Sequence, residues 1–197
     1  INLLLLSNSF YFENKFNVAK AYLCYYAYNL REYNLSKSIT DVLVIQLASN
    51  KYIDHFDYCL MNYYKGLIYI ANEKINEAAI SFILALSIYP SGMTQTTYNI
   101  IQIECSKRLV IIYPVISSDL QKQVISCLDN NEVLFALKNM ESYSNIKTVT
   151  FNSKSSYEDY MKCLNQFKTV LSADKVLVST LFKQYLINLG YIQTCYF

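Results

Sequence analysis

The sequence predicts an all-α fold in which antiparallel helix pairs stack into a right-handed solenoid, with no winged-helix module in the chain. Three observations predict it. Apolar residues recur at steps of three and four along almost the whole chain, as on one face of an α-helix. Both prolines and two of the three glycines, Gly92 and Gly190, fall where these runs stop. Residues 55–90 have the spacing of a helix-pair repeat, which favours a solenoid over a globular bundle.

The first half of the chain contains four predicted helices, each recognised by its apolar stripe. They cover residues 16–33, 39–47, 55–70 and 75–88. The fourth is apolar on nearly all sides, so we expect an inner helix that is contacted from two directions. Pro90 and Gly92 end it, because proline cannot continue a helix.

The second half contains five predicted helices and one predicted loop. The helices cover residues 94–113, 118–128, 133–140, 155–171 and 178–189. The first of them ends at Pro114 and places Glu104, Lys107 and Arg108 on its outward face. Residues 142–154 are polar and β-branched without a helical stripe, and they are predicted to form a loop.

The composition limits the classes of protein to which the chain can belong. The chain has 197 residues, of which 53% are hydrophobic and 16% charged, which excludes a disordered polypeptide and allows one helical-repeat domain over residues 1–197. The net charge of +2 makes nucleic acid a poor first guess as a partner. No segment is long and apolar enough for a membrane span or has the pattern of a signal peptide. We expect a soluble assembly subunit, and the missing first Met suggests an internal fragment.

The six cysteines are spread along the chain without a CxxC pair or clustered spacing. In a chain with this much core-forming material, we expect buried, reduced thiols rather than a disulfide framework. Reduced thiols are typical of the cytoplasm and nucleus.

The helix-pair repeat is the sharpest motif in the sequence. Small residues, aromatic residues and a closing proline follow one another in a tetratricopeptide-like pattern, at Gly66, Tyr69, Ala78, Phe82, Ala85 and Pro90. The small residues let two antiparallel helices approach closely, and the aromatic rings fill the adjoining space. Asn62 and Lys65 stand where this repeat prefers Trp and Leu, so the repeat is degenerate. The preceding pair of predicted helices has a similar layout at a slightly longer period.

This stretch resembles the scaffold subunits of the proteasome lid, the signalosome and the initiation factor, known as the PCI family. The likeness is carried by residues 63–70, by Glu77, Ala78 and Phe82, and by a His55–Phe56 pair before them. A basic pair, Lys107 and Arg108, followed by an aliphatic run, extends it. A weaker likeness continues through Tyr157 to Tyr185, so that it covers about three quarters of the chain.

The resemblance, strongest to the COP9 signalosome, implies a noncatalytic scaffold in a cullin deneddylase complex of the ubiquitin pathway. It implies other PCI-type subunits as partners, and a location in both the cytoplasm and the nucleus. Subunits of the proteasome lid or of the initiation factor are the sister alternatives. The family adds a winged-helix module after its helical repeats, and the chain shows no β-hairpin signal for one.

The sequence offers little catalytic chemistry. His55 is the only histidine, and His55 with Cys59 lacks the further ligands of a zinc site. No glycine-rich phosphate loop or paired-carboxylate frame is present. We expect no catalytic residue, no metal, no cofactor and no small-molecule substrate.

Two features are candidates for a protein interface. Tyr22, Tyr25, Tyr26 and Tyr28 surround their helix, and packing and a protein interface are equally favoured for them. Lys107 and Arg108 form a basic pair, for which a solvated helix face is favoured.

Two other functional classes remain beside a scaffold. A peptide-binding adaptor would show a basic or polar ladder along its inner helices. A helical enzyme would need a cleft with shifted titratable groups.

Overall fold

The computed structural model describes residues 18–33, 55–87, 100–128, 141–151 and 157–166, and these residues are helical apart from short turns. No strand occurs in them, which confirms the all-helical prediction. The helices are α2 (Val18–Asn29), α4 (His55–Ala71), α5 (Ile75–Leu86), α6 (Ile100–Ile112), the 3-10 turn η2 (Tyr113–Val115), α7 (Ser118–Leu128), α9 (Glu141–Phe151) and α10 (Tyr157–Gln166).

The same backbone turn ends both α2 and α4. Arg31 and Glu73 are the two non-glycine residues with positive φ, at 59° and 60°, among the described residues. Just after each, a backbone N–H donates to a carbonyl five residues back, from Glu32 to Ala27 and from Lys74 to Tyr69. A left-handed residue after the last helical turn lets the next N–H reach back to otherwise unpaired carbonyls. The two turns lie 42 residues apart.

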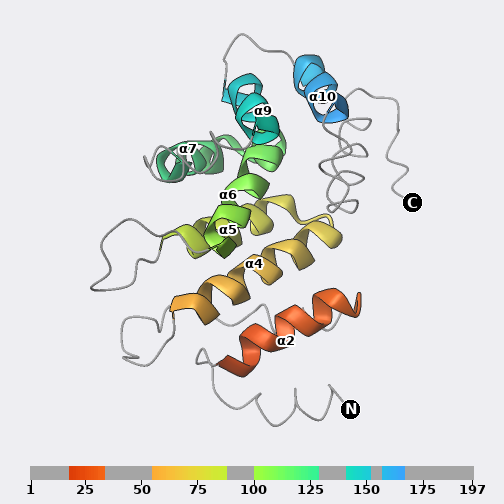
Figure 1. The fold of residues 1–197 in the computed structure, drawn as a ribbon, viewed down its shortest axis with the longest axis vertical. Coiled ribbons are helices and arrows are strands. Elements are labelled where there is room, and N and C mark those ends of the chain that lie inside the picture. Colours follow the sequence, from red (N-terminus) through yellow and green to blue (C-terminus); the bar gives the residue numbers. More distant parts are fainter. Residues whose placement is uncertain (1–17, 34–54, 88–99, 129–140, 152–156, 167–197) are drawn as a thin grey trace.

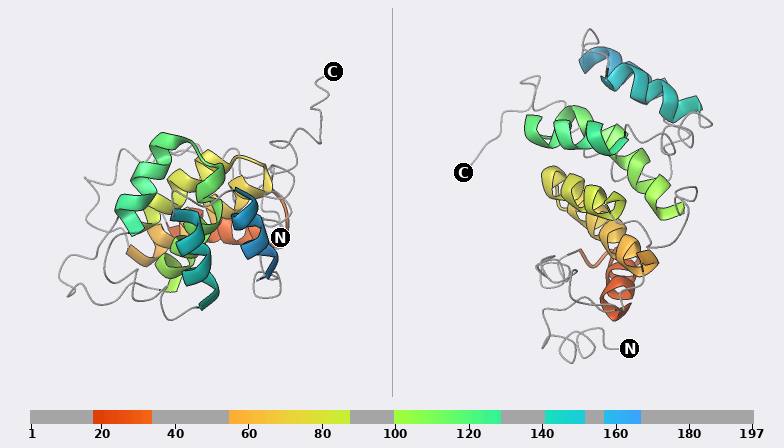
Figure 2. Two further views of the ribbon diagram at one scale, coloured as in Figure 1. Left: turned by 90° about the horizontal axis from the view of Figure 1, so that it is seen from above. Right: turned by 90° about the vertical axis from the view of Figure 1, so that its left-hand side faces the viewer.

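The helices follow one another in chain order along the long axis of the molecule (Figure 1), and Figure 2 shows the same succession from the side. Tyr25 and Tyr28 of α2 lie beside Tyr64 of α4, and Tyr33 after α2 lies beside Asn72 after α4, so these helices run parallel. Later residues of α4 contact later residues of α6, so this pair of helices also runs parallel. α5 runs antiparallel to α4 between them.

The core lies where α5 meets its neighbours. α5 contacts α4, α6 and α7, which confirms the prediction of an inner helix. Its side chains Ala78, Ala79, Phe82 and Ala85 are fully buried. A second, smaller cluster fills the space between α2 and α4.

The predicted loop at residues 142–154 is wrong for residues 142–151, because α9 covers Glu141–Phe151. Residues 152–154 lie outside the described residues. Tyr143 and Ile146 are buried, Val149 packs against the core, and α9 contacts α6. The hydroxyl of Thr148 donates to the carbonyl of Ser144, so a β-branched residue is accommodated within the helix. Packing against α6 therefore stabilises a helix whose local propensity is poor.

Several predictions lie outside the described residues. They concern the helices at 39–47, 133–140 and 178–189, the ends at Pro90 and Gly92, and Cys195. Among the described helices, none is both long and apolar enough to cross a bilayer.

Candidate protein-interaction surface

Gly66 lets α4 and α5 pack closely. A Cβ atom at Gly66 would lie within 2.8 Å of three atoms of the Phe82 ring, a spacing that real side chains do not reach. Ala78, Phe82 and Ala85 are fully buried, and Tyr69 is half-buried against the core. The α4–α5 pair is thus held by a ring placed directly over a glycine.

Side chains from two helices converge on one carbonyl near the end of α5. The thiol of Cys59 in α4 donates to the Ala85 oxygen at 3.3 Å, and Nε2 of Gln102 in α6 donates to it at 3.2 Å. A carbonyl in the last turn of a helix lacks an intrahelical partner. These bonds satisfy it and join three consecutive described helices.

The tyrosines of α2 divide between two faces. Tyr22, Tyr25 and Tyr26 lie on one stripe with Leu30, and these four side chains are 37–57% exposed. Tyr28 is half-buried and packs against Tyr64 of α4. The four tyrosines therefore do not form one stripe: three members share the outward stripe and one packs inside. We call Tyr22, Tyr25, Tyr26 and Leu30 the outer stripe.

The opposite face of α2 carries small residues. Ala21, Cys24 and Ala27 are at most 2% exposed and form a cluster with Tyr58, Met61 and Ile68 of α4. Small residues on one helix thus receive large residues of the next, which is how two helix surfaces interdigitate.

A row of aromatic rings leads from the outer stripe into the core. Ring centroids are 5.2 Å apart for Tyr26–Tyr25, 5.1 Å for Tyr25–Tyr64, 5.1 Å for Tyr64–Tyr63 and 6.3 Å for Tyr63–Phe82. The first three pairs are edge-to-face, a favourable arrangement of ring quadrupoles. The row joins α2, α4 and α5.

The expected solvated face at Lys107 and Arg108 is wrong for Arg108, which is 6% exposed. Its guanidinium donates to Glu104 at 2.9 Å and to the Tyr63 hydroxyl at 3.3 Å, and it lies over the Tyr63 ring. Lys107 pairs with the same carboxylate and lies 5.3 Å from the centre of the Tyr143 ring. α4 and α9 cover this part of α6, so both cations join helices to one another.

Sequence reasoning missed Glu104 as the centre of this group. The spacing of Glu104 and Arg108, four residues apart on a helix, is the signal that could have found it. Tyr63 and Tyr143 come from other helices and carry no such signal.

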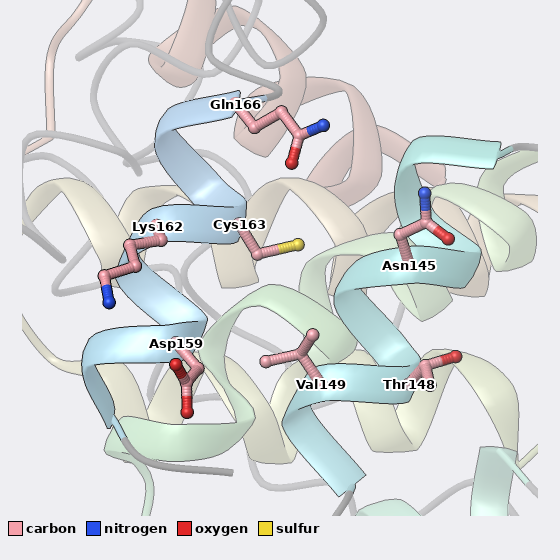
Figure 3. A pocket seen from close by; sticks show the side chains of 7 residues that line it. All are labelled: Asn145, Thr148, Val149, Asp159, Lys162, Cys163 and Gln166. Atoms are coloured by element: carbon pink, nitrogen blue, oxygen red, sulfur yellow. The ribbon is translucent and has the colours of Figure 1, made fainter.

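A shallow groove of about 360 Å³ lies between α9 and α10 (Figure 3). Val149 and Cys163 point into it from opposite helices, and Asn145, Asp159 and Gln166 are among its other lining residues. Burial raises the pKa of the Cys163 thiol, which disfavours the thiolate that a nucleophile needs. The groove therefore offers polar contacts and a thiol that burial keeps protonated.

Three of the four other described thiols are also protected by burial. Cys24, Cys59 and Cys105 are buried, and none of the five described cysteines forms a disulfide, as expected. Burial raises the pKa of Cys24 to about 12, with Lys65 opposing the shift, and it raises the pKa of Cys105 well above the usual range. In the described part of the chain, no three residues of ligating type gather as a metal site would require.

Comparisons of the chain with models of protein families, with curated proteins and with solved structures found no match.

Proposed function

We propose that this chain is a noncatalytic scaffold that works through protein–protein contacts of stacked helix pairs. The observation that carries the proposal is the recurrence of one structural unit. α2 and α4 run parallel and end in the same left-handed turn 42 residues apart. A unit that repeats in this way buries its apolar faces by stacking on its neighbours.

The contacts between helices support a TPR-like array, and we propose that its hand is right-handed. α4 contacts both the next described helix, α5, and the one after it, α6. α5 contacts α6 and α7 in the same manner. In a globular bundle, contacts would not follow chain order so regularly. The Gly66–Phe82 contact supplies the small-residue and aromatic packing of such a pair.

The specific assignment that we propose is the third subunit of the COP9 signalosome, in the cytoplasm and nucleus, with other PCI-type subunits as partners. It rests on the resemblance at residues 63–70, Glu77, Ala78 and Phe82. A scaffold subunit of the proteasome lid or of the initiation factor is the alternative within the same class.

A peptide-binding adaptor is less favoured by the geometry. Its expected ladder of polar groups would have to face a ligand. Instead, Arg108 and Lys107 are engaged between helices with Glu104, Tyr63 and Tyr143. The polar groups along α6 thus hold the array together.

Affinity purification of the tagged protein from the cells that make it, followed by mass spectrometry, tests the proposal. We expect several helical-repeat subunits in stoichiometric amounts, including those of the signalosome. Recovery of proteasome-lid or initiation-factor subunits would transfer the assignment to that complex. A monomer in the lysate would contradict the scaffold function itself.

A further inference from the structure

We propose that the outer stripe of α2 binds a helix of a different protein chain, and that this partner helix presents small residues at steps of three and four. The inference rests on the proposed scaffold function and names the surface and the kind of partner. Tyr22, Tyr25, Tyr26 and Leu30 form the stripe, and α2 lies at one end of the described helices (Figure 1).

The internal repeat indicates which surface of α4 is equivalent to the outer stripe. The turns after α2 and α4 share three backbone hydrogen bonds, and each bond of the first turn has its equivalent 42 residues later. On this correspondence, Tyr22 is equivalent to Tyr64 and Tyr26 to Ile68. Tyr64 and Ile68 are two of the residues with which α4 packs against α2. At Tyr22 and Tyr26, the outer stripe is therefore the same docking face, one repeat earlier.

The contact between α2 and α4 indicates which side chains a partner of the outer stripe must present. α4 receives α2 through the small residues Ala21, Cys24 and Ala27. Large side chains on one helix require small ones opposite if the axes are to approach to the usual 8–10 Å. A helix that docks on the outer stripe, parallel to α2, therefore needs Ala, Gly, Ser or Cys at the corresponding positions.

The lack of charge on the outer stripe further restricts the residues that a partner helix can present. No position of the outer stripe, nor Asn29 beside it, carries a charge. A charged residue on the facing stripe of the partner would lose water without gaining an ion pair, which is costly. The docking stripe of the partner is therefore uncharged as well as small.

A second copy of the chain fits the stripe poorly. The exposed part of the four side chains amounts to roughly 400 Å², about half of the ~800 Å² that each partner buries in a stable interface, so any partner must make further contacts outside the stripe. Two copies meeting stripe to stripe would set large rings against large rings, without the small residues that receive large ones between α2 and α4. The alanine-bearing faces of α2 and α5 are buried within the chain. One helix of a larger partner fits better.

Photocross-linking of the full chain in the cells that make it tests the proposal. p-Benzoylphenylalanine replaces Tyr26, and the cross-linked peptides are mapped by mass spectrometry. We expect an adduct to another polypeptide, within a segment where small, uncharged residues recur at steps of three and four. The matched control places the same amino acid at Ile125, which is 38% exposed on α7. It should not give that adduct.

Several results would overturn the inference. They are an adduct to a second copy, an adduct within the same chain, an adduct to a segment without small residues, and no adduct. A second measurement uses the double variant Tyr22→Lys, Tyr26→Glu, with Ile125→Lys as control. We expect at least a tenfold loss of the cross-linked partner from affinity purification for the double variant alone, at an unchanged melting temperature.

The outcome separates this inference from the proposed function. If the double variant still recovers every subunit at the wild-type level, the inference fails and the scaffold function stands. If the wild-type chain recovers no subunits, both fail. If the double variant does not fold, the cross-link from the otherwise unaltered chain decides.

Discussion

At the scale of single residues, Gly66 shows how one missing Cβ sets the distance between two helices. In an exposed helix, Gly→Ala stabilises by about 1 kcal/mol through helix propensity. Here the new Cβ would displace the buried Phe82 ring, and overpacking costs about 1–3 kcal/mol. We expect Gly66→Ala to lower the free energy of unfolding by about 1–2 kcal/mol in urea titrations. Adding Phe82→Leu should recover part of the loss. A gain in stability on Gly66→Ala alone would contradict the close contact.

The raised pKa of Cys24 predicts that the free energy of unfolding falls at alkaline pH. Its pKa is about 12 in the folded chain against an ordinary value of 9.0, because burial disfavours the thiolate. Above pH 9 the unfolded chain releases this proton while the folded chain keeps it, so stability falls as pH rises. We expect a loss of about 2 kcal/mol from this group between pH 9 and pH 10.5. Urea unfolding of Cys24→Ala should show a shallower decline than the wild type. If the stability of both proteins declined equally with pH, the raised pKa of Cys24 would be contradicted.

At the scale of elements, Glu104 couples α6 to its neighbours. It pairs with Lys107 and Arg108, and the side chain of Arg108 is nearly buried. Removing its charge takes an ion-pair partner away from both cations in a place where water reaches them poorly. We expect Glu104→Gln to cost about 2 kcal/mol in thermal or urea unfolding, less than for a fully buried pair because Glu104 is 28% exposed.

The exposed pair on α7 is the matched control for Glu104. Asp119 and Lys122 are 3.8 Å apart, with side chains that are 88% and 80% exposed. Solvent screens such a pair, so Asp119→Asn should leave stability almost unchanged. Similar losses for Asp119→Asn and Glu104→Gln would show that burial at α6 does not matter.

At the scale of the whole molecule, the serial order of contacts predicts graded stability. α4 packs against α2, α5 and α6, whereas the principal contacts of α10 are with α9. In a stacked array each unit depends on its neighbours, so an end element opens at lower free energy than a central one. Native-state hydrogen exchange should give opening free energies for α10 at least about 2 kcal/mol below those of α4 and α5. A single value for all described helices would indicate one cooperative unit.

The sequence by itself determined that the described part of the chain is helical, where α4, α5 and α7 lie, and that α5 is an inner helix. These features follow from local periodicity and from breakers, which are written in neighbouring residues. It also anticipated the buried thiols of Cys24, Cys59 and Cys105.

The tertiary structure alone decided three things. It made α9 a helix, because burial of Tyr143 and Ile146 against α6 outweighs weak propensity. It turned Arg108 inward, because Tyr63 lies 45 positions away in sequence but within hydrogen-bonding distance in space. It left the outer stripe of α2 exposed, since burial depends on which faces other helices cover, and no local pattern records that.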